Sequence, residues 1–167
     1  MNKLYSKYLI LLPVFVLLQI LILNEILFFN YINPFLYLTL IISLPLKTSK
    51  WILLLYAFLL GFFIDLFSGI LGFHSTASVF IAFIKPTIAK ITIPYNILED
   101  TDEINLEKIG SKSFIVFSTI LILFHNSILF MLEHLHWNLH IQGKILASSL
   151  MTLVLILILE ILKSSKK

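Results

Sequence analysis

Long apolar runs separated by short polar stretches dominate the chain. A membrane-spanning helix needs about 20 mostly apolar residues, within a range of about 17–25. The pattern predicts six such helices, over the approximate ranges 9–29, 34–46, 51–68, 73–91, 114–135 and 145–162. The range 34–46 is short and bounded by prolines, so we expect it to tilt little or to thin the bilayer locally. We therefore predict an all-α integral membrane protein with one transmembrane domain over residues 1–167.

Composition agrees with this pattern. The 167 residues are 59% hydrophobic and 13% charged, whereas soluble domains have about 45–50% apolar and about 25% charged residues. Too few charges are present to cover a water-facing surface. The longest polar stretch, residues 92–113, is expected to be a solvated loop or a docking surface for a cytoplasmic protein. The N-terminal run lacks a small-residue cleavage motif, so we expect it to remain as the first helix.

The positive charges predict the orientation. All twelve basic residues are lysines, and lysines that flank spans stay on the cytoplasmic side. With a cytoplasmic N-terminus and six crossings, only Lys144 lies outside, and both termini are cytoplasmic. The sequence has no arginine for bidentate phosphate contacts, which argues against a nucleic-acid partner.

Asp65 is a carboxylate inside an apolar run, at about 21 Å along the third predicted span. A charge near the bilayer centre costs about 2.5–3.5 kcal/mol, so such residues usually face the bundle interior. Gly61, Asp65 and Gly69 are spaced i, i+4, i+8 and share one helix face, where small residues allow another helix to approach closely. We predict a helix-packing seam that also receives a partner's transmembrane helix, formed by Gly61, Asp65, Gly69, Gly72, Ser78 and Ala82.

Three predicted spans carry polar side chains at similar depth, about 17–23 Å from their inner ends. These side chains predict a buried polar cluster in the outer half of the bundle, made of Asn24, Glu25, Asp65, His125 and Asn126. Three roles are open for it. Polar groups can act only as interhelical hydrogen bonds of about 0.6 kcal/mol each, can form a partner or ligand site, or can conduct protons or ions.

Motifs for catalysis or metal binding are not found in the sequence. His136 and His140 have helical i, i+4 spacing but lack the H-E-x-x-H pattern of zinc proteases. Trp137, beside them, is expected to be an interfacial anchor. No nucleophile elbow or phosphate-binding loop occurs. We expect no metal, no cofactor and no enzymatic activity.

The stretch "GFFIDLFSGILGFHSTASVFIAFIKP" over residues 61–86 resembles the central signature of the MreD family of rod shape-determining membrane proteins. The resemblance rests on a G-x-x-x-D pattern, a glycine-containing turn and a following helix rich in small side chains, with Gly61, Asp65, Gly69, Gly72, Ala77, Ser78 and Ala82. Lys85-Pro86 stands where Arg-Pro is expected, as in Bacteroidota-like members.

The resemblance implies a non-enzymatic component of the bacterial inner membrane. Members of this family maintain rod shape by scaffolding lateral peptidoglycan synthesis. They associate with MreC, and through it with MreB, RodA and the elongation transpeptidase. The resemblance also implies a fold similar to the substrate-binding (S) component of energy-coupling-factor transporters.

That similarity defines the alternative function, a substrate-binding component of a vitamin-uptake transporter. Such a protein needs a ligand pocket of aromatic and polar side chains beneath the outer loops. A third interpretation, a proton-coupled transporter, is disfavoured because the bundle is small and has no evident inverted repeat.

Overall fold

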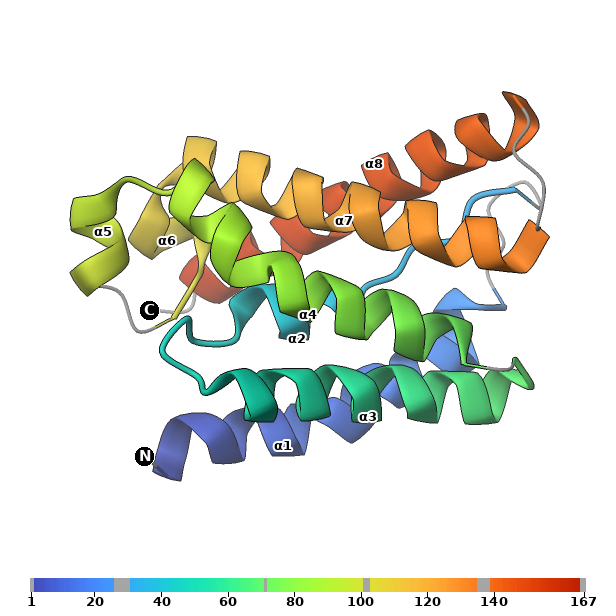
Figure 1. The fold of residues 1–167 in the computed structure, drawn as a ribbon, viewed down its shortest axis with the longest axis horizontal. Helices are drawn as coiled ribbons and strands as arrows, with labels where there is room; N and C mark the ends of the chain where they lie inside the picture. Colours follow the sequence, from blue (N-terminus) through green and yellow to red (C-terminus); the bar gives the residue numbers. More distant parts are fainter. Residues whose placement is uncertain (1, 26–30, 71, 101–102, 135–138, 166–167) are drawn as a thin grey trace.

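The computed structural model describes residues 2–25, 31–70, 72–100, 103–134 and 139–165 (Figure 1). Within these ranges the chain forms helices and turns and no β-strand. The elements are α1 (Asn2–Leu18), the π-helix η1 (Gln19–Leu23) that continues it, α2 (Leu38–Ser43), α3 (Lys50–Ser68), α4 (Phe73–Thr92), α5 (Tyr95–Asp100), α6 (Leu106–Ile109), α7 (Ser111–His134) and α8 (Leu139–Ser164).

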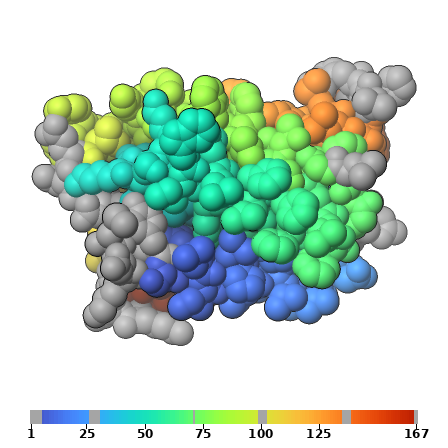
Figure 2. Space-filling view, turned by 60° about the horizontal axis from the view of Figure 1, so that its bottom comes forward, coloured from blue at the N-terminus to red at the C-terminus, as the bar shows by residue number. Residues whose placement is uncertain are grey.

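The long elements run along one axis of the bundle in alternating directions. In Figure 1 this order is α1, the segment 31–44 that contains α2, α3, α4, α7 and α8. Both termini therefore lie at the same end of the bundle, together with α5 and α6 (Figure 1). Helix α3 packs on α4, α4 on α7, and α7 on α8, whereas α1 lies beside α3 across the face shown in Figure 2.

Four helical stretches in the described part of the chain are long and apolar enough to cross a membrane: Ser6–Leu23, Lys50–Ser68, Ser111–His134 and Leu139–Ser164. This composition is compatible with a multi-pass membrane protein. Helix α4 has a comparable length of 20 residues, but it carries polar side chains that are buried within the bundle, His74, Ser75, Ser78 and Lys85. Its packing between α3 and α7 explains why its sequence is less apolar than theirs.

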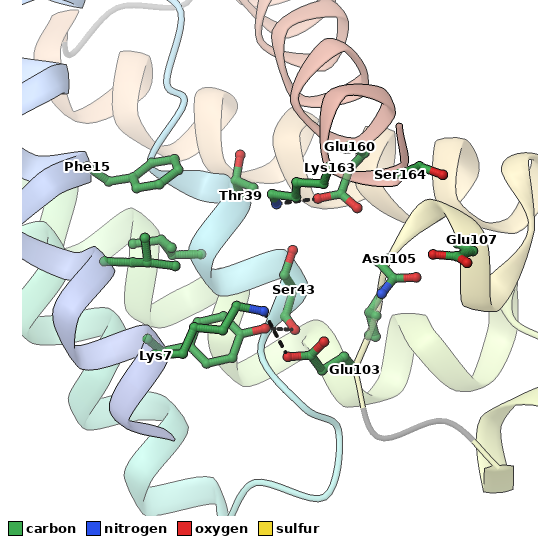
Figure 3. Close-up of a pocket in the computed structure, with 14 residues that line it drawn as sticks. Lys7, Phe15, Thr39, Ser43, Glu103, Asn105, Glu107, Glu160, Lys163 and Ser164 are labelled. Carbon is green, nitrogen blue, oxygen red and sulfur yellow. Dashed lines mark hydrogen bonds and ion pairs between the residues drawn. The ribbon is translucent and has the colours of Figure 1, made fainter. Parts of the chain in front are cut away.

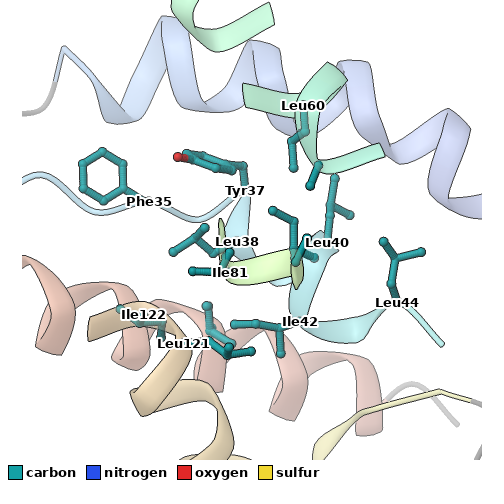
Figure 4. Close-up of a cluster of buried hydrophobic side chains, with 14 of the residues drawn as sticks. Phe35, Tyr37, Leu38, Leu40, Ile42, Leu44, Leu60, Ile81, Leu121 and Ile122 are labelled. Carbon is teal, nitrogen blue, oxygen red and sulfur yellow. The ribbon is translucent and has the colours of Figure 1, made fainter. Parts of the chain in front are cut away.

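The prediction of a helical span over 34–46 is wrong. Only Leu38–Ser43 is α-helical there, and residues 32–35 are not helical. Every residue from 34 to 45 is buried. Figure 4 shows side chains of this segment at the centre of the hydrophobic core, surrounded by residues of the neighbouring helices such as Leu60, Ile81, Leu121 and Ile122. Pro34 and Pro45 border the predicted helix, and prolines disfavour helix beside them, which explains why this apolar run is not helical throughout.

The broken conformation changes the length of this segment. A non-helical residue advances about 3.3 Å along the chain axis and a helical one about 1.5 Å. Residues 31–43 therefore reach about 30 Å, the thickness of the hydrocarbon core, although they are too few for a spanning helix. A segment of this length could cross the hydrocarbon core without the local thinning that we expected from the sequence.

Helices α3 and α4 form a close hairpin. A Cβ atom on Gly61 would lie 2.5 Å from the backbone Cα of Ser75, so only glycine permits this approach. Gly69, which ends α3, and Gly72, which precedes α4, have φ angles of +67° and +77° that favour glycine. Ser78 and Ala82 are also buried within the chain. The seam that we expected to receive a partner's helix is thus occupied at Gly61 by α4 of the same chain.

Replacing Gly61 by alanine tests this contact. We expect Gly61→Ala to destabilise the protein by about 1–3 kcal/mol, because the added methyl group must separate two backbones. The measurement is the midpoint of thermal unfolding of the purified protein in detergent. Leu66→Phe is the control, since Leu66 is on the same helix but 59% exposed. Equal midpoints for both variants would contradict the close packing.

Candidate functional site

Asp65 caps the first turn of α4. Its Oδ1 accepts a hydrogen bond from the backbone N–H of His74 at 2.9 Å. Its Oδ2 accepts two more, from the N–H of Ser75 at 2.8 Å and from the Ser75 hydroxyl at 2.5 Å. The first N–H groups of a helix have no intrahelical partners, and a carboxylate is favoured beside them. Asp65 is 4% exposed, and these bonds explain how a carboxylate is accommodated there.

The non-helical backbone of residues 33–36 is paired with side chains from two helices. The N–H of Asn33 donates to the Ser148 hydroxyl at 3.1 Å, and the N–H of Phe35 donates to the Thr152 hydroxyl at 3.0 Å. The amide of Gln19 completes the pairing, since its Oε1 accepts from the N–H of Leu36 and its Nε2 donates to the carbonyl of Pro34. Proline itself has no N–H. Each N–H of residues 33–36 is therefore satisfied.

The C-terminal carbonyls of α2 are paired in the same way. Lys85 is fully buried, and its Nζ donates to the carbonyl oxygens of Ile41 at 2.8 Å and Leu44 at 2.5 Å. The hydroxyl of Tyr8 donates to the carbonyl of Ser43 at 2.6 Å. From the sequence Lys85 could be expected to extend toward the headgroups, as long lysine side chains often do. Instead it lies in the core, where its hydrogen bonds to Ile41 and Leu44 stabilise the end of α2.

A chain of buried polar side chains crosses the middle of the bundle. The hydroxyl of Tyr37 lies 3.0 Å from Nδ1 of His74 and 2.7 Å from Nε2 of His125. Nδ1 of His125 is 3.1 Å from Oδ1 of Asn126, whose Nδ2 donates to the hydroxyl of Ser149 at 2.9 Å. These residues connect the segment before α2 with α4, α7 and α8.

The donors and acceptors of this chain match when both imidazoles are neutral. The Asn126 carbonyl oxygen can only accept, so Nδ1 of His125 carries the proton and its Nε2 accepts from Tyr37. The Tyr37 oxygen then accepts from the Nδ1 proton of His74. Since a buried hydrogen-bonded network of this kind favours one arrangement of the elements it joins, we assign it a positioning role in the fold.

A pocket of about 490 Å³ opens beside this network, at the end of the bundle opposite the termini (Figure 1). It lies where η1, the ends of α3 and α7 and the starts of α4 and α8 meet. Lys144 forms an ion pair with Glu133 at 3.5 Å on its wall, and Oδ1 of Asn33 has no hydrogen-bond partner among the described residues. The lining combines polar and aromatic side chains, including Asn24, Glu25, Phe35, Ser68, Phe73, His74 and Phe130.

The structure divides the predicted polar cluster into two parts. Asn24 and Glu25 line the pocket, where Asn24 donates to Ser68 at 3.1 Å and accepts from Gln19 at 2.9 Å. Asp65, His125 and Asn126 are buried. No direct hydrogen bond joins Asp65 to His125 in the described structure. His74 connects the two parts, because its backbone bonds Asp65 and its side chain bonds Tyr37 and lines the pocket.

The remaining candidates lie in or beside the α7–α8 connection. Trp137 and His136 are outside the described residues, and His140 is exposed. Among the residues that are described, no group of three or more histidine, aspartate, glutamate or cysteine side chains could hold a metal ion.

Several buried residues that make hydrogen bonds in the bundle were not identified from the sequence: Gln19, Tyr37, His74, Ser148, Ser149, Thr152 and Glu160. The last of these accepts a hydrogen bond from Lys163 at 2.6 Å. Gln19 and Glu160 are isolated polar residues in apolar runs, which is a usable signal. Ser148 and Thr152 are i, i+4 on one face of α8, a signal of the same kind. Tyr37 and His74 are amphipathic and border turns, so only their partners reveal their role.

Searches of family models, of curated proteins and of solved structures found no match for this chain.

Two buried hydroxyls test the pairing of the broken segment. Thr152→Val keeps the side-chain shape but leaves the N–H of Phe35 without an acceptor, so we expect a loss of about 1–3 kcal/mol in stability. Ser118→Ala is the matched control, because the Ser118 hydroxyl is equally buried and has no partner in the described structure. Thermal unfolding in detergent should show a lower midpoint for the first variant only. A similar loss in both would mean that the Thr152 hydrogen bond is not specifically required.

Proposed function

We propose that this chain is a non-enzymatic scaffold of the bacterial inner membrane that helps maintain rod shape. In this proposal the chain crosses the membrane six times. The 31–44 segment is the crossing with the least helix, and α4 is the least apolar of the helical crossings. The fold resembles that of the S component of energy-coupling-factor transporters. The chain associates with an MreC-like protein and, through it, with MreB, RodA and the elongation transpeptidase. The resemblance of residues 61–86 to the MreD signature motivates the assignment.

Charge placement supports the orientation in this proposal. Lys50 begins α3, Lys112 lies in the first turn of α7, and Lys90 and Lys163 lie in the last turns of α4 and α8. These helix ends lie at the same end of the bundle as both termini (Figure 1). Under the positive-inside rule this end is cytoplasmic.

The observation that carries the scaffold function is an apolar groove of about 530 Å³ between the first half of α3 and the second half of α4. The two helices touch closely at Gly61 and Ser75 and leave the groove beyond this contact. Its rim carries Trp51, 84% exposed, and Phe83, 70% exposed. A single transmembrane helix of the MreC-like partner fits this site, because apolar side chains of a partner can pack between two helices without exposing polar backbone.

Filling the groove tests the scaffold function. Thr87 is exposed and lines the groove, so Thr87→Trp should reduce copurification of the MreC-like protein of the same organism to about a tenth, the factor for a loss of about 1.4 kcal/mol. Leu150→Trp is the control, since Leu150 is 65% exposed on α8, away from the groove. Unchanged copurification with Thr87→Trp would exclude this interface, and no copurification with the unmodified chain would exclude the scaffold function.

The pocket of about 490 Å³ opposite the termini, which the proposed orientation places outside and which we call the outer pocket, favours a second candidate function: substrate binding for vitamin uptake. Its volume of about 490 Å³ lies within the range of about 300–1,000 Å³ for small-molecule sites. The unpartnered Oδ1 of Asn33 and the Lys144–Glu133 pair supply groups that can orient a polar ligand.

Equilibrium dialysis with labelled B vitamins tests this candidate. Binding should be weakened about tenfold or more by Asn33→Ala, because a buried polar contact would be lost. Asn96→Ala is the control, since Asn96 is exposed in α5 at the opposite end of the bundle. Absence of binding by the unmodified chain would exclude vitamin uptake and leave the scaffold function.

A further inference from the structure

A second polar pocket, of about 300 Å³, lies at the end of the bundle that carries the termini (Figure 3). Its walls come from α1, α2, the linker that precedes α6, and the end of α8. Charged and hydroxyl side chains line one part of it, and Leu11, Phe15 and Leu40 line the other. None of the residues in the outer pocket belongs to it.

Two buried hydroxyl groups face this pocket without a partner. Thr39 is 1% exposed and Ser43 is 8% exposed, and neither side-chain oxygen has a hydrogen bond in the described part of the chain. A buried hydroxyl without a partner costs about 1–3 kcal/mol, so its presence beside a cavity points to a polar group that it can bond. Both residues line the pocket (Figure 3).

Four charged residues of the pocket form two opposite pairs, and Glu107 is a fifth charged residue in its lining. Lys7 pairs with Glu103 at 3.2 Å, and Lys163 pairs with Glu160 at 2.6 Å. Glu160 is only 3% exposed, whereas the side chain of Lys163 is 54% exposed. Besides the bond from Lys163, Glu160 accepts one long hydrogen bond of 3.4 Å from the N–H of Leu106 within the described part of the chain. A carboxylate has about four acceptor positions, so Glu160 retains capacity for a further donor.

The shape of the pocket favours a lipid over a water-soluble ligand. Lys7, Leu11 and Phe15 are spaced i, i+4, i+8, so they lie along one face of α1 over about 12 Å. This face passes from a charged residue at the helix start to aromatic and aliphatic residues within the apolar stretch Ser6–Leu23. A headgroup at the level of Lys7 would place its acyl chains along Leu11 and Phe15.

We propose that this pocket binds the headgroup of a zwitterionic aminophospholipid, phosphatidylethanolamine. The ammonium group of the lipid donates to the buried carboxylate of Glu160. Its phosphate accepts from Lys7 and Lys163, whose side chains extend from opposite walls into the pocket (Figure 3), and from the hydroxyls of Thr39 and Ser43. The glycerol headgroup of phosphatidylglycerol has hydroxyl donors but no positive charge to pair with Glu160, and a choline headgroup has no N–H to donate.

Lipid retention by the purified full-length chain tests the proposal. The protein in detergent is mixed with equal amounts of phosphatidylethanolamine, phosphatidylcholine and phosphatidylglycerol, and bound lipids are counted by native mass spectrometry. We expect phosphatidylethanolamine to be retained about tenfold better than phosphatidylcholine, the factor for one charge-assisted hydrogen bond. Equal retention of these two would overturn the proposal, and preference for phosphatidylglycerol would show an anion site instead.

Two variants assign the binding to this pocket. Glu160→Gln should abolish the preference for phosphatidylethanolamine over phosphatidylcholine, whereas Glu133→Gln, at the opposite end of the bundle, should keep it. Thr39→Val combined with Ser43→Ala should lower phosphatidylethanolamine retention without lowering the unfolding temperature in lipid-free detergent, because these hydroxyls have no protein partner. An unchanged preference in Glu160→Gln would place the lipid elsewhere. A fall in lipid-free stability of the hydroxyl variant, with unchanged retention, would show a purely structural role.

Discussion

Non-helical backbone is tolerated at membrane depth only where protein groups satisfy its N–H and C=O groups, because the hydrocarbon offers none. The segment of residues 31–44 places this requirement at the centre of the bundle. Side chains from η1 and α8 pair its extended part, and Lys85 and Tyr8 pair the carbonyls at the end of α2. The surrounding helices cover residues 34–45 of this part of the chain, all of which are buried.

This constraint explains why polar residues occur inside otherwise apolar helices. Gln19, Lys85 and Thr152 are each fully buried and each bonds the backbone of the broken segment. Tyr37 belongs to the segment itself and joins α4 and α7 through two histidines. Helix α4 carries polar residues for the same reason, because its Lys85 bonds the backbone of the broken segment and its His74 bonds Tyr37. These residues lower the hydropathy of α4, although it packs between two apolar helices. Asp65 serves a related purpose, because it satisfies the first N–H groups of α4 where the hairpin is closest.

The apolar core of α2 separates two polar pockets at opposite ends of the bundle. The pocket opposite the termini adjoins the histidine network and has the volume of a small-molecule site, and the pocket beside the termini carries paired charges and unpartnered hydroxyls. The apolar groove between α3 and α4 is distinct from both. The scaffold function that we propose would use this groove and leave both pockets available. A lipid in the pocket beside the termini would occupy the space between α1 and α8. It would thereby link the local membrane composition to the packing of the first and last helices.

The sequence by itself determined the all-helical character, the approximate ranges of α3, α4 and α7 and the burial of Asp65, because these follow from apolar periodicity and from the cost of a charge in hydrocarbon. It also placed Gly61 in a close seam, since spacing along a helix defines a face. The predicted ranges 9–29 and 145–162 begin several residues after the starts of α1 at Asn2 and α8 at Leu139. Only the tertiary structure decided what fills that seam, that residues 32–35 are not helical, and that Lys85 points inward. These outcomes depend on hydrogen bonds between residues far apart in the chain, such as Phe35 with Thr152 and Lys85 with Ile41, and local patterns carry no record of such partners.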